Sequence, residues 1–201
     1  MTYNILLFPS VFHWCEVSNF EYVRDTLINF AYEEKEKYPE SLIKSNGGGW
    51  HSPDNIYSTY DNPLHHIVKS ALTTFFANSG IFVENVDFAI SALWVNINKK
   101  GNFHYNHLHP NSDFSGVLWI KVPDESSEIG FSSPNNYNQW RSTQIYKSDF
   151  RNTIGLQPSW SFTPSEGNML LFPSSIMHKV LPNESEEDRI AASFNLSVGN
   201  K

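Results

Sequence analysis

Cysteine is almost absent from the chain: Cys15 is the only one among 201 residues. A single cysteine forms no disulfide within the chain, and it rules out a CxxC motif or a cysteine-rich zinc cluster. The lone cysteine also fits a reducing compartment, so we expect a cytoplasmic protein. Histidine, by contrast, occurs eight times. A metal site in this chain would therefore have to use imidazole ligands.

Basic residues and long apolar runs are also scarce. The 14 lysines and arginines stand against 21 acidic residues, the net charge is −7, and no basic run exceeds two residues. Binding a phosphate backbone requires a positive surface, so we expect no nucleic-acid partner. No stretch approaches the roughly 18 apolar residues of a membrane-spanning helix, and the N-terminus lacks the basic region of a signal peptide. We therefore expect no membrane association.

The remaining composition is typical of a globular protein, with 40% hydrophobic, 15% aromatic and 17% charged residues. This balance excludes a disordered tail, a collagen-like repeat and a coiled coil. A chain of this length suits one domain, and no linker divides it. We therefore expect a single domain over residues 1–201.

Two amphipathic helices are predicted in the N-terminal part, residues 1–80. Ser18-Asn19-Phe20-Glu21 matches a capping box and predicts a helix over residues 19–37. Asn62-Pro63 predicts the start of a second helix, and Gly80 predicts its end. Apolar residues at helical spacing indicate that each helix packs one face against a core. We expect the pair to support the rest of the fold.

After Gly80 the apolar pattern alternates, which predicts strands. The predicted strands cover residues 87–98, 116–122, 129–132, 159–163, 168–172, 177–181 and 189–197. Many short strands without helices between them favour an antiparallel sandwich or barrel, so the fold class is mainly β (α+β), with the β core over residues 81–201. Residues 135–157 show no period and are predicted to form a long loop at one mouth of the barrel, where substrate contacts are common.

Three histidines, His104, His107 and His109, fall within six residues. Alternate side chains of a strand point to the same side, so His107 and His109 can converge on one metal ion if the segment is extended. His104 has the opposite parity and is expected to point away from that ion, as a surface or supporting residue. The alternative interpretation of the pair is two partly exposed polar residues near a strand end.

The C-terminal third adds His178, at the start of a predicted strand, and Arg189, eleven residues later. This ordered set resembles the Fe(II)/2-oxoglutarate-dependent dioxygenases, and among them the small oxygenases of marine bacteria and phages that have a prolyl-hydroxylase-like motif layout. The matching features keep a fixed order along the chain: Gly101 six residues before His107, then His107-Leu108-His109-Pro110, Ser115-Gly116-Val117, Gly167, Phe172-Pro173 and His178.

The resemblance implies a double-stranded β-helix, or jelly roll, that holds iron at its mouth. It places His107 and His178 at two of the ligand positions, and it matches Arg189 to the basic residue that grips the far carboxylate of 2-oxoglutarate. Ser193 and Asn195 share the strand face of Arg189 and could complete that pocket. A surface ion pair with the acidic residues 184–188 is the alternative interpretation of Arg189.

One ligand position departs from the family pattern, because the widespread motif is His-x-Asp/Glu and this chain has His109 where the carboxylate would stand. We favour His109 as the third ligand, since strand parity brings it to the metal without a bend. The alternative is that Asp113 folds back as a carboxylate ligand and His109 supports the site.

The implied activity is oxidation of a C–H bond, with hydroxylation as the default outcome. The resemblance implies Fe(II) and 2-oxoglutarate as cofactors, O₂ as the oxidant, and succinate and CO₂ as products. Two other functions remain open on the sequence. One is a cupin-like metal enzyme that uses three histidines without 2-oxoglutarate, and the other is a jelly-roll binding module without catalysis.

Overall fold

The structure is a computed structural model, and it describes residues 9–59, 61–80 and 86–200. Eleven strands within these residues form two antiparallel sheets. Their bounds are β1 (His13–Glu16), β2 (Asn46–Gly47), β3 (Trp50–His51), β4 (Val86–Asn98), β5 (Phe103–His107), β6 (Phe114–Lys121), β7 (Ile129–Ser132), β8 (Ser159–Phe162), β9 (Asn168–Pro173), β10 (His178–Val180) and β11 (Arg189–Asn200).

One sheet has six strands in the order β1-β9-β6-β11-β4-β3, and the other has five in the order β2-β5-β10-β7-β8. Most neighbouring strands within each sheet are not consecutive in the chain, which is the arrangement of a jelly roll. The prediction of a mainly β fold of the double-stranded β-helix type is confirmed. The predicted domain boundary at residue 81 falls in residues 81–85, outside the described part.

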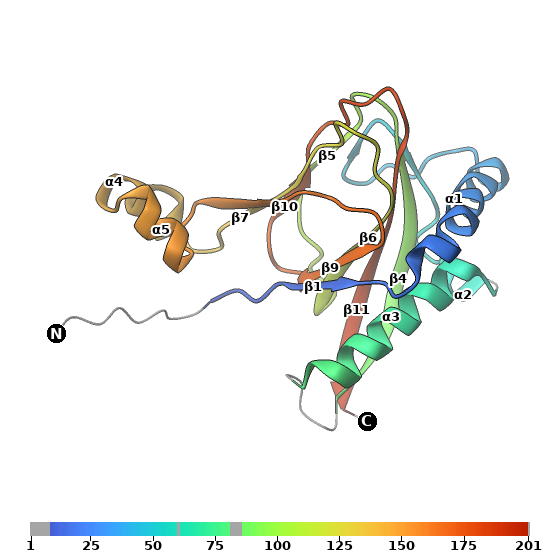
Figure 1. Cartoon of the computed structure of the whole chain (residues 1–201), viewed down its shortest axis with the longest axis horizontal. Helices are drawn as coiled ribbons and strands as arrows, with labels where there is room; N and C mark the ends of the chain where they lie inside the picture. Colours follow the sequence, from blue (N-terminus) through green and yellow to red (C-terminus); the bar gives the residue numbers. More distant parts are fainter. Residues whose placement is uncertain (1–8, 60, 81–85, 201) are drawn as a thin grey trace.

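Two long helices, α1 (Phe20–Lys37) and α3 (Pro63–Ser79), lie beside the six-stranded sheet, together with the short helix α2 (Ile56–Thr59) (Figure 1). Their buried side chains join one hydrophobic cluster with the outer face of that sheet. The helical contributors are Phe20, Leu27, Phe30, Ala31, Ile56, Leu64, Val68 and Leu72. Burial against a sheet is what stabilises helices of this length, since isolated ones are marginal in water.

The local signals for α3 are confirmed. Asn62 caps the helix by accepting a hydrogen bond from the backbone N–H of His65 at 2.8 Å, and Gly80 ends it in the left-handed conformation with φ 63°. The predicted capping box of α1 is wrong, although its helix is correct. Asn19 precedes α1 at φ 55°, and no side chain caps this end. The left-handed turn at Asn19 replaces the extended residue that a capping box requires.

A second hydrophobic cluster fills the space between the two sheets at one end. Its buried members are Val117, Trp119, Ile129, Phe131, Leu170, Phe172 and Ile176. The other end of this space holds polar side chains instead and forms a cavity. Within the described residues, no helix combines the length and the apolar character needed to cross a bilayer.

The prediction that residues 135–157 form a long loop is wrong. The segment is not a loop but forms the short helices η1 (Tyr137–Arg141), α4 (Ser142–Ile145) and α5 (Ser148–Ile154). Figure 1 shows α4 and α5 at the end of the molecule away from α1 and α3. No residue of the segment lines the polar cavity. The segment borders a separate cavity of about 400 Å³, together with Pro9, Ser10 and Phe12.

Candidate active site

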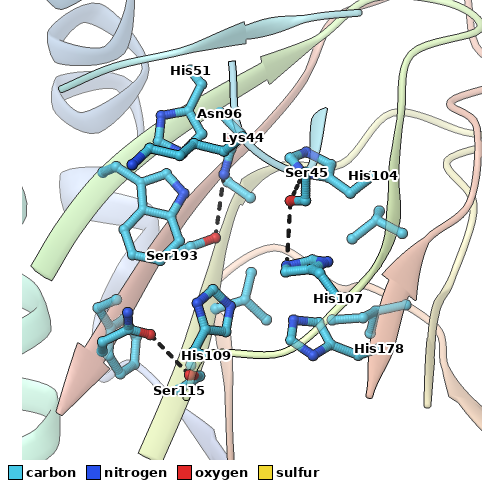
Figure 2. Close-up of a pocket in the computed structure, with 18 of the residues that line it drawn as sticks. Lys44, Ser45, His51, Asn96, His104, His107, His109, Ser115, His178 and Ser193 are labelled. Carbon is cyan, nitrogen blue, oxygen red and sulfur yellow. Dashed lines mark hydrogen bonds between the residues drawn. The ribbon is translucent and has the colours of Figure 1, made fainter. Parts of the chain in front are cut away.

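The polar end of the interior is a cavity of about 590 Å³, open to one side and lined by strands of both sheets. Its walls carry all six residues that the sequence predicted to bind the metal or the cosubstrate, and Figure 2 shows several of them. These six are His107, His109, His178, Arg189, Ser193 and Asn195. The fold therefore brings the predicted metal and cosubstrate residues to one place.

The three histidines offer ring nitrogens that all lie within 4.8 Å of one another, close enough to hold one metal ion. His107 ends β5 and His178 begins β10, and the two are cross-strand partners. His109 lies two residues beyond β5, where its backbone N–H donates to the carbonyl of Ser174 at 2.9 Å. Backbone pairing thus fixes two of the rings, and one loop contact fixes the third.

Hydrogen bonds to carbonyls set the tautomers of two of these rings. Nδ1 of His107 lies 2.7 Å from the carbonyl of Tyr105, and Nδ1 of His178 lies 2.9 Å from that of Ile176. A carbonyl only accepts, so each Nδ1 carries the hydrogen and each Nε2 keeps a lone pair. Metal-binding histidines commonly show this arrangement, in which a hydrogen bond anchors the N–H of one ring nitrogen and the other nitrogen binds the metal.

Burial keeps the three rings neutral. Desolvation lowers the pKa of His107, lowers that of His109 to about 4, and lowers that of His178 to about 3. A histidine must be neutral to bind a metal, so all three are ready to bind at neutral pH. Three imidazoles suit Fe(II), and an octahedral ion would keep three further positions for other ligands.

Asp113 lies apart from this group. Its Oδ2 accepts a hydrogen bond from the backbone N–H of Val198 at 2.7 Å, and the residue does not line the cavity. This placement favours His109 over Asp113 as the third ligand, and the choice stays a prediction.

His104 is not a surface residue, contrary to one of the two expected roles. It is buried in the cavity wall outside the group of three, where its Nδ1 lies 3.3 Å from Oγ of Ser45. Burial is the main cause that lowers the pKa of His104 to about 3. The ring is therefore neutral and can both donate and accept.

Arg189 is only 2% exposed. Its guanidinium donates to the carbonyls of Leu181 and Ser127 at 3.2 and 3.3 Å, and burial lowers its pKa to about 10. Within the described residues it has no carboxylate partner. A buried cation is costly unless an anion joins it, so this arrangement fits an anionic ligand.

The surface ion pair expected as the alternative for Arg189 is not formed. The acidic residues beside it are engaged elsewhere: Glu186 pairs with Lys100, Glu187 with Lys121, and Asp188 accepts from the hydroxyl of Tyr32.

Ser193 and Asn195 follow Arg189 along the same face of β11, as predicted. Oγ of Ser193 accepts from the amide of Asn96 at 3.3 Å, and Oδ1 of Asn195 accepts from Oγ of Ser115 at 2.8 Å. Both side chains are thus held in place at the cavity wall.

Sequence reasoning missed several lining residues. Asn96 and Asn98 alternate in the apolar strand β4, and two amides on one strand face are a signal that could have been used. Lys44, Ser45 and His51 come from the segment around β2 and β3, which carries no local pattern.

Comparison with solved structures shows the fold of 2-oxoglutarate oxygenases. A prolyl-4-hydroxylase from Pseudomonas putida is 14% identical, with a TM-score of 0.59 and 92% of each chain covered. A prolyl hydroxylase from Trichoplax adhaerens, in complex with a hypoxia inducible factor peptide, is 11% identical, with a TM-score of 0.63, covering 92% of this chain and 83% of that one. HygX from Streptomyces hygroscopicus, with nickel and 2-oxoglutarate bound, is 9% identical, with a TM-score of 0.60, covering 94% and 83%.

No curated protein matches the sequence. Residues 92–195, just over half of the chain, match the sequence family described as "Putative 2OG-Fe(II) oxygenase". This range contains residues 92–98 of β4, all three clustered histidines and the cavity-lining residues of β11. The chain therefore belongs to this 2OG-Fe(II) oxygenase family, whose cofactors are Fe(II) and 2-oxoglutarate.

Proposed function

We propose that the chain is an Fe(II)- and 2-oxoglutarate-dependent hydroxylase in which His107, His109 and His178 hold the iron and Arg189 binds the cosubstrate. The observation that carries this proposal is the shared cavity: three convergent neutral imidazoles and one buried guanidinium without a carboxylate partner line the same space. Together, Fe(II), 2-oxoglutarate and O₂ supply the oxidising chemistry, with succinate and CO₂ as products.

The donors of Arg189 support the role proposed for it. The carbonyls of Leu181 and Ser127 take three N–H donors, two from Nη1 and one from Nη2. A guanidinium has five, so Nε–H and one Nη2–H stay available. These two donors are parallel, which is the geometry that binds one carboxylate through both oxygens. The two carbonyls thus orient the guanidinium of Arg189, and the carboxylate of the cosubstrate would neutralise its charge.

The cavity walls exclude water from the reacting centre. Trp94 and Trp119 are 8% and 4% exposed and line the cavity, and Phe172 packs edge-on against His178 at 4.8 Å between ring centroids. A dry site strengthens every electrostatic contact inside it and protects the enzyme from side reactions. Substrate would enter through the open side, past the exposed Tyr105 and Leu108.

Anaerobic titration tests this function. Metal-free protein is titrated with Fe(II) and then with 2-oxoglutarate, and the weak visible band of the chelated cosubstrate is followed. We expect the band in the wild type and in the control Lys121→Ala, and its loss in Arg189→Ala with Fe(II) binding retained. If Arg189→Ala keeps the band, the role of Arg189 is wrong.

Turnover distinguishes the alternatives. Succinate formation from 2-oxoglutarate under O₂ supports the hydroxylase, and it should vanish in Arg189→Ala. A wild type that binds Fe(II) but forms neither the band nor succinate would instead support a three-histidine metal enzyme without this cosubstrate, or a binding module.

A further inference from the structure

The hydroxyl of Ser45 stands beside the histidine group, although the residue lies 62 positions before His107. It is placed there by backbone pairing: Asn46 of β2 pairs with His104 of β5, and the carbonyl of Ser45 accepts from the N–H of Tyr105 at 2.7 Å. Figure 2 shows the side chain of Ser45 between the rings of His104 and His107. The position of this hydroxyl is therefore built into the sheet.

Oγ of Ser45 lies 3.3 Å from Nδ1 of His104 and 3.3 Å from Nε2 of His107. On its far side, Nε2 of His104 lies 3.4 Å from the amide nitrogen of Asn98. The side chains of four residues thus form a row of polar contacts that ends at the group of three histidines. In order, they are Asn98, His104, Ser45 and His107.

The chemistry of the two ends gives this row a direction. The amide nitrogen of Asn98 can only donate, so Nε2 of His104 accepts and its Nδ1–H donates to Ser45. At the other end, Nδ1–H of His107 is used by the carbonyl of Tyr105, so Nε2 of His107 is an acceptor. The hydroxyl of Ser45 must donate to it. Each group in the row therefore donates to the next.

Metal binding breaks this row at one point. The lone pair of Nε2 on His107 is the one that a metal takes, so the Ser45 hydroxyl loses its acceptor while His104 continues to donate to Oγ. Ser45 is half-buried, and its hydroxyl would turn to a new acceptor, because an unmade hydrogen bond is costly where water is partly excluded. The cavity in front of His107 is the space into which it can turn.

We propose that Ser45 is a cosubstrate-binding residue, whose hydroxyl donates in the metal-loaded site to an anionic oxygen of 2-oxoglutarate bound beside His107. This inference rests on the proposed function. His104 and Asn98 are positioning residues in it, because they hold the hydroxyl oxygen and leave its hydrogen free to turn.

The inference makes two predictions of opposite sign for Ser45→Ala. Fe(II) no longer competes with the hydroxyl for His107, so anaerobic metal affinity should stay equal or rise by up to about fivefold. The affinity of the Fe(II)-loaded protein for 2-oxoglutarate should fall by about tenfold, as for the loss of one hydrogen bond to a charged group. Ser45→Thr should restore both values, and the exposed Ser58→Ala should change neither.

A measurement on the metal-free protein tests the row itself. With ¹⁵N-labelled histidine, the ring shifts should show Nδ1–H tautomers for both His104 and His107. Ser45→Ala should move the Nδ1 shift of His104 and the Nε2 shift of His107, and should leave the ring shifts of the exposed His66 in place. An Nε2–H tautomer of His104 would overturn the proposed direction of hydrogen-bond donation along the row.

The outcomes separate this inference from the function on which it rests. A wild type that binds Fe(II) and 2-oxoglutarate, with Ser45→Ala equal to it in cosubstrate affinity, overturns only the inference. If Ser45→Ala binds both Fe(II) and 2-oxoglutarate more weakly, the inference is also overturned, because a general structural defect would give that result. A wild type that does not bind 2-oxoglutarate contradicts the proposed function and the inference together.

Discussion

His107 and His178 are direct cross-strand partners, and their ring centroids lie 4.2 Å apart. His107 is the last residue of β5 and His178 is the first residue of β10. The register of this strand pair therefore sets the distance between two candidate metal ligands. A metal that binds both would link the ends of two strands. Metal binding should therefore stabilise the folded state by mass action.

The third ligand can be identified by comparing two variants. His109→Ala should weaken Fe(II) or Co(II) binding at least about 100-fold, since it removes one of three ligands. Asp113→Ala should bind with wild-type affinity, because its carboxylate is occupied by the N–H of Val198 and lies outside the cavity. Isothermal titration under anaerobic conditions measures both affinities. The reverse result would make Asp113 the ligand.

Acid should destabilise the metal-free protein through its buried histidines. The pKa of His104 is about 3 in the folded state and about 6.5 when unfolded, so between these values only the unfolded chain carries the proton. The free energy of unfolding should therefore fall as the pH drops from about 6.5 towards 3, by about 1.4 kcal/mol per pH unit for this group. Urea unfolding at several pH values should show a shallower dependence for His104→Gln than for the wild type. The control His66→Gln, at an exposed site, should keep the wild-type dependence.

Substitution by alanine should have opposite effects on stability at two glycines, Gly116 and Gly130. A Cβ on Gly116 would lie 2.2 Å from Cζ of Phe194, which is fully buried, so Gly116→Ala should destabilise by about 1–3 kcal/mol. A Cβ on Gly130 would meet nothing closer than 3.5 Å. Gly130→Ala should be neutral or stabilising, by up to about 1 kcal/mol, because it restricts the unfolded chain. Equal denaturant midpoints for the two variants would contradict this account of the packing.

The segment over residues 135–157 should be dispensable for cofactor binding. Trp140 is 58% exposed in η1, and nothing in this segment lines the histidine cavity. Trp140→Ala should therefore keep the wild-type affinities for Fe(II) and 2-oxoglutarate, within about twofold in the anaerobic titration. A larger loss would show that this segment reaches the site.

The sequence predicted those parts of the fold whose signals are local. The second long helix has its cap at Asn62, its proline at the first turn and its stop at Gly80, all within the element. The strands β2 and β3 were missed because each has two residues, too few to show a period. They form only because Gly48 and Gly49 turn the chain, at φ 76° and 74°, toward partners far away in the sequence.

The same distinction holds in the site. That His107, His109, His178 and Arg189 would come together could be predicted, because they stand in ordered motifs that resemble a known family. Ser45 could not, since its position depends on the pairing of β2 with β5 across nearly 60 residues. The short helices of residues 135–157 were missed because most of their side chains are exposed, which leaves no apolar stripe.

The strand β11 faces the cavity with every second residue and the helices with the others. Its cavity side carries Arg189, Ala191, Ser193 and Asn195. Its other side carries Ile190, Ala192, Phe194 and Leu196, all 0% exposed. Side chains on the cavity side of β11 can therefore vary, whereas those on the helix side must keep their volume. New ligand preferences could arise at the odd positions without repacking the core, whereas inserting one residue would exchange the two sides and cost both the fold and the site.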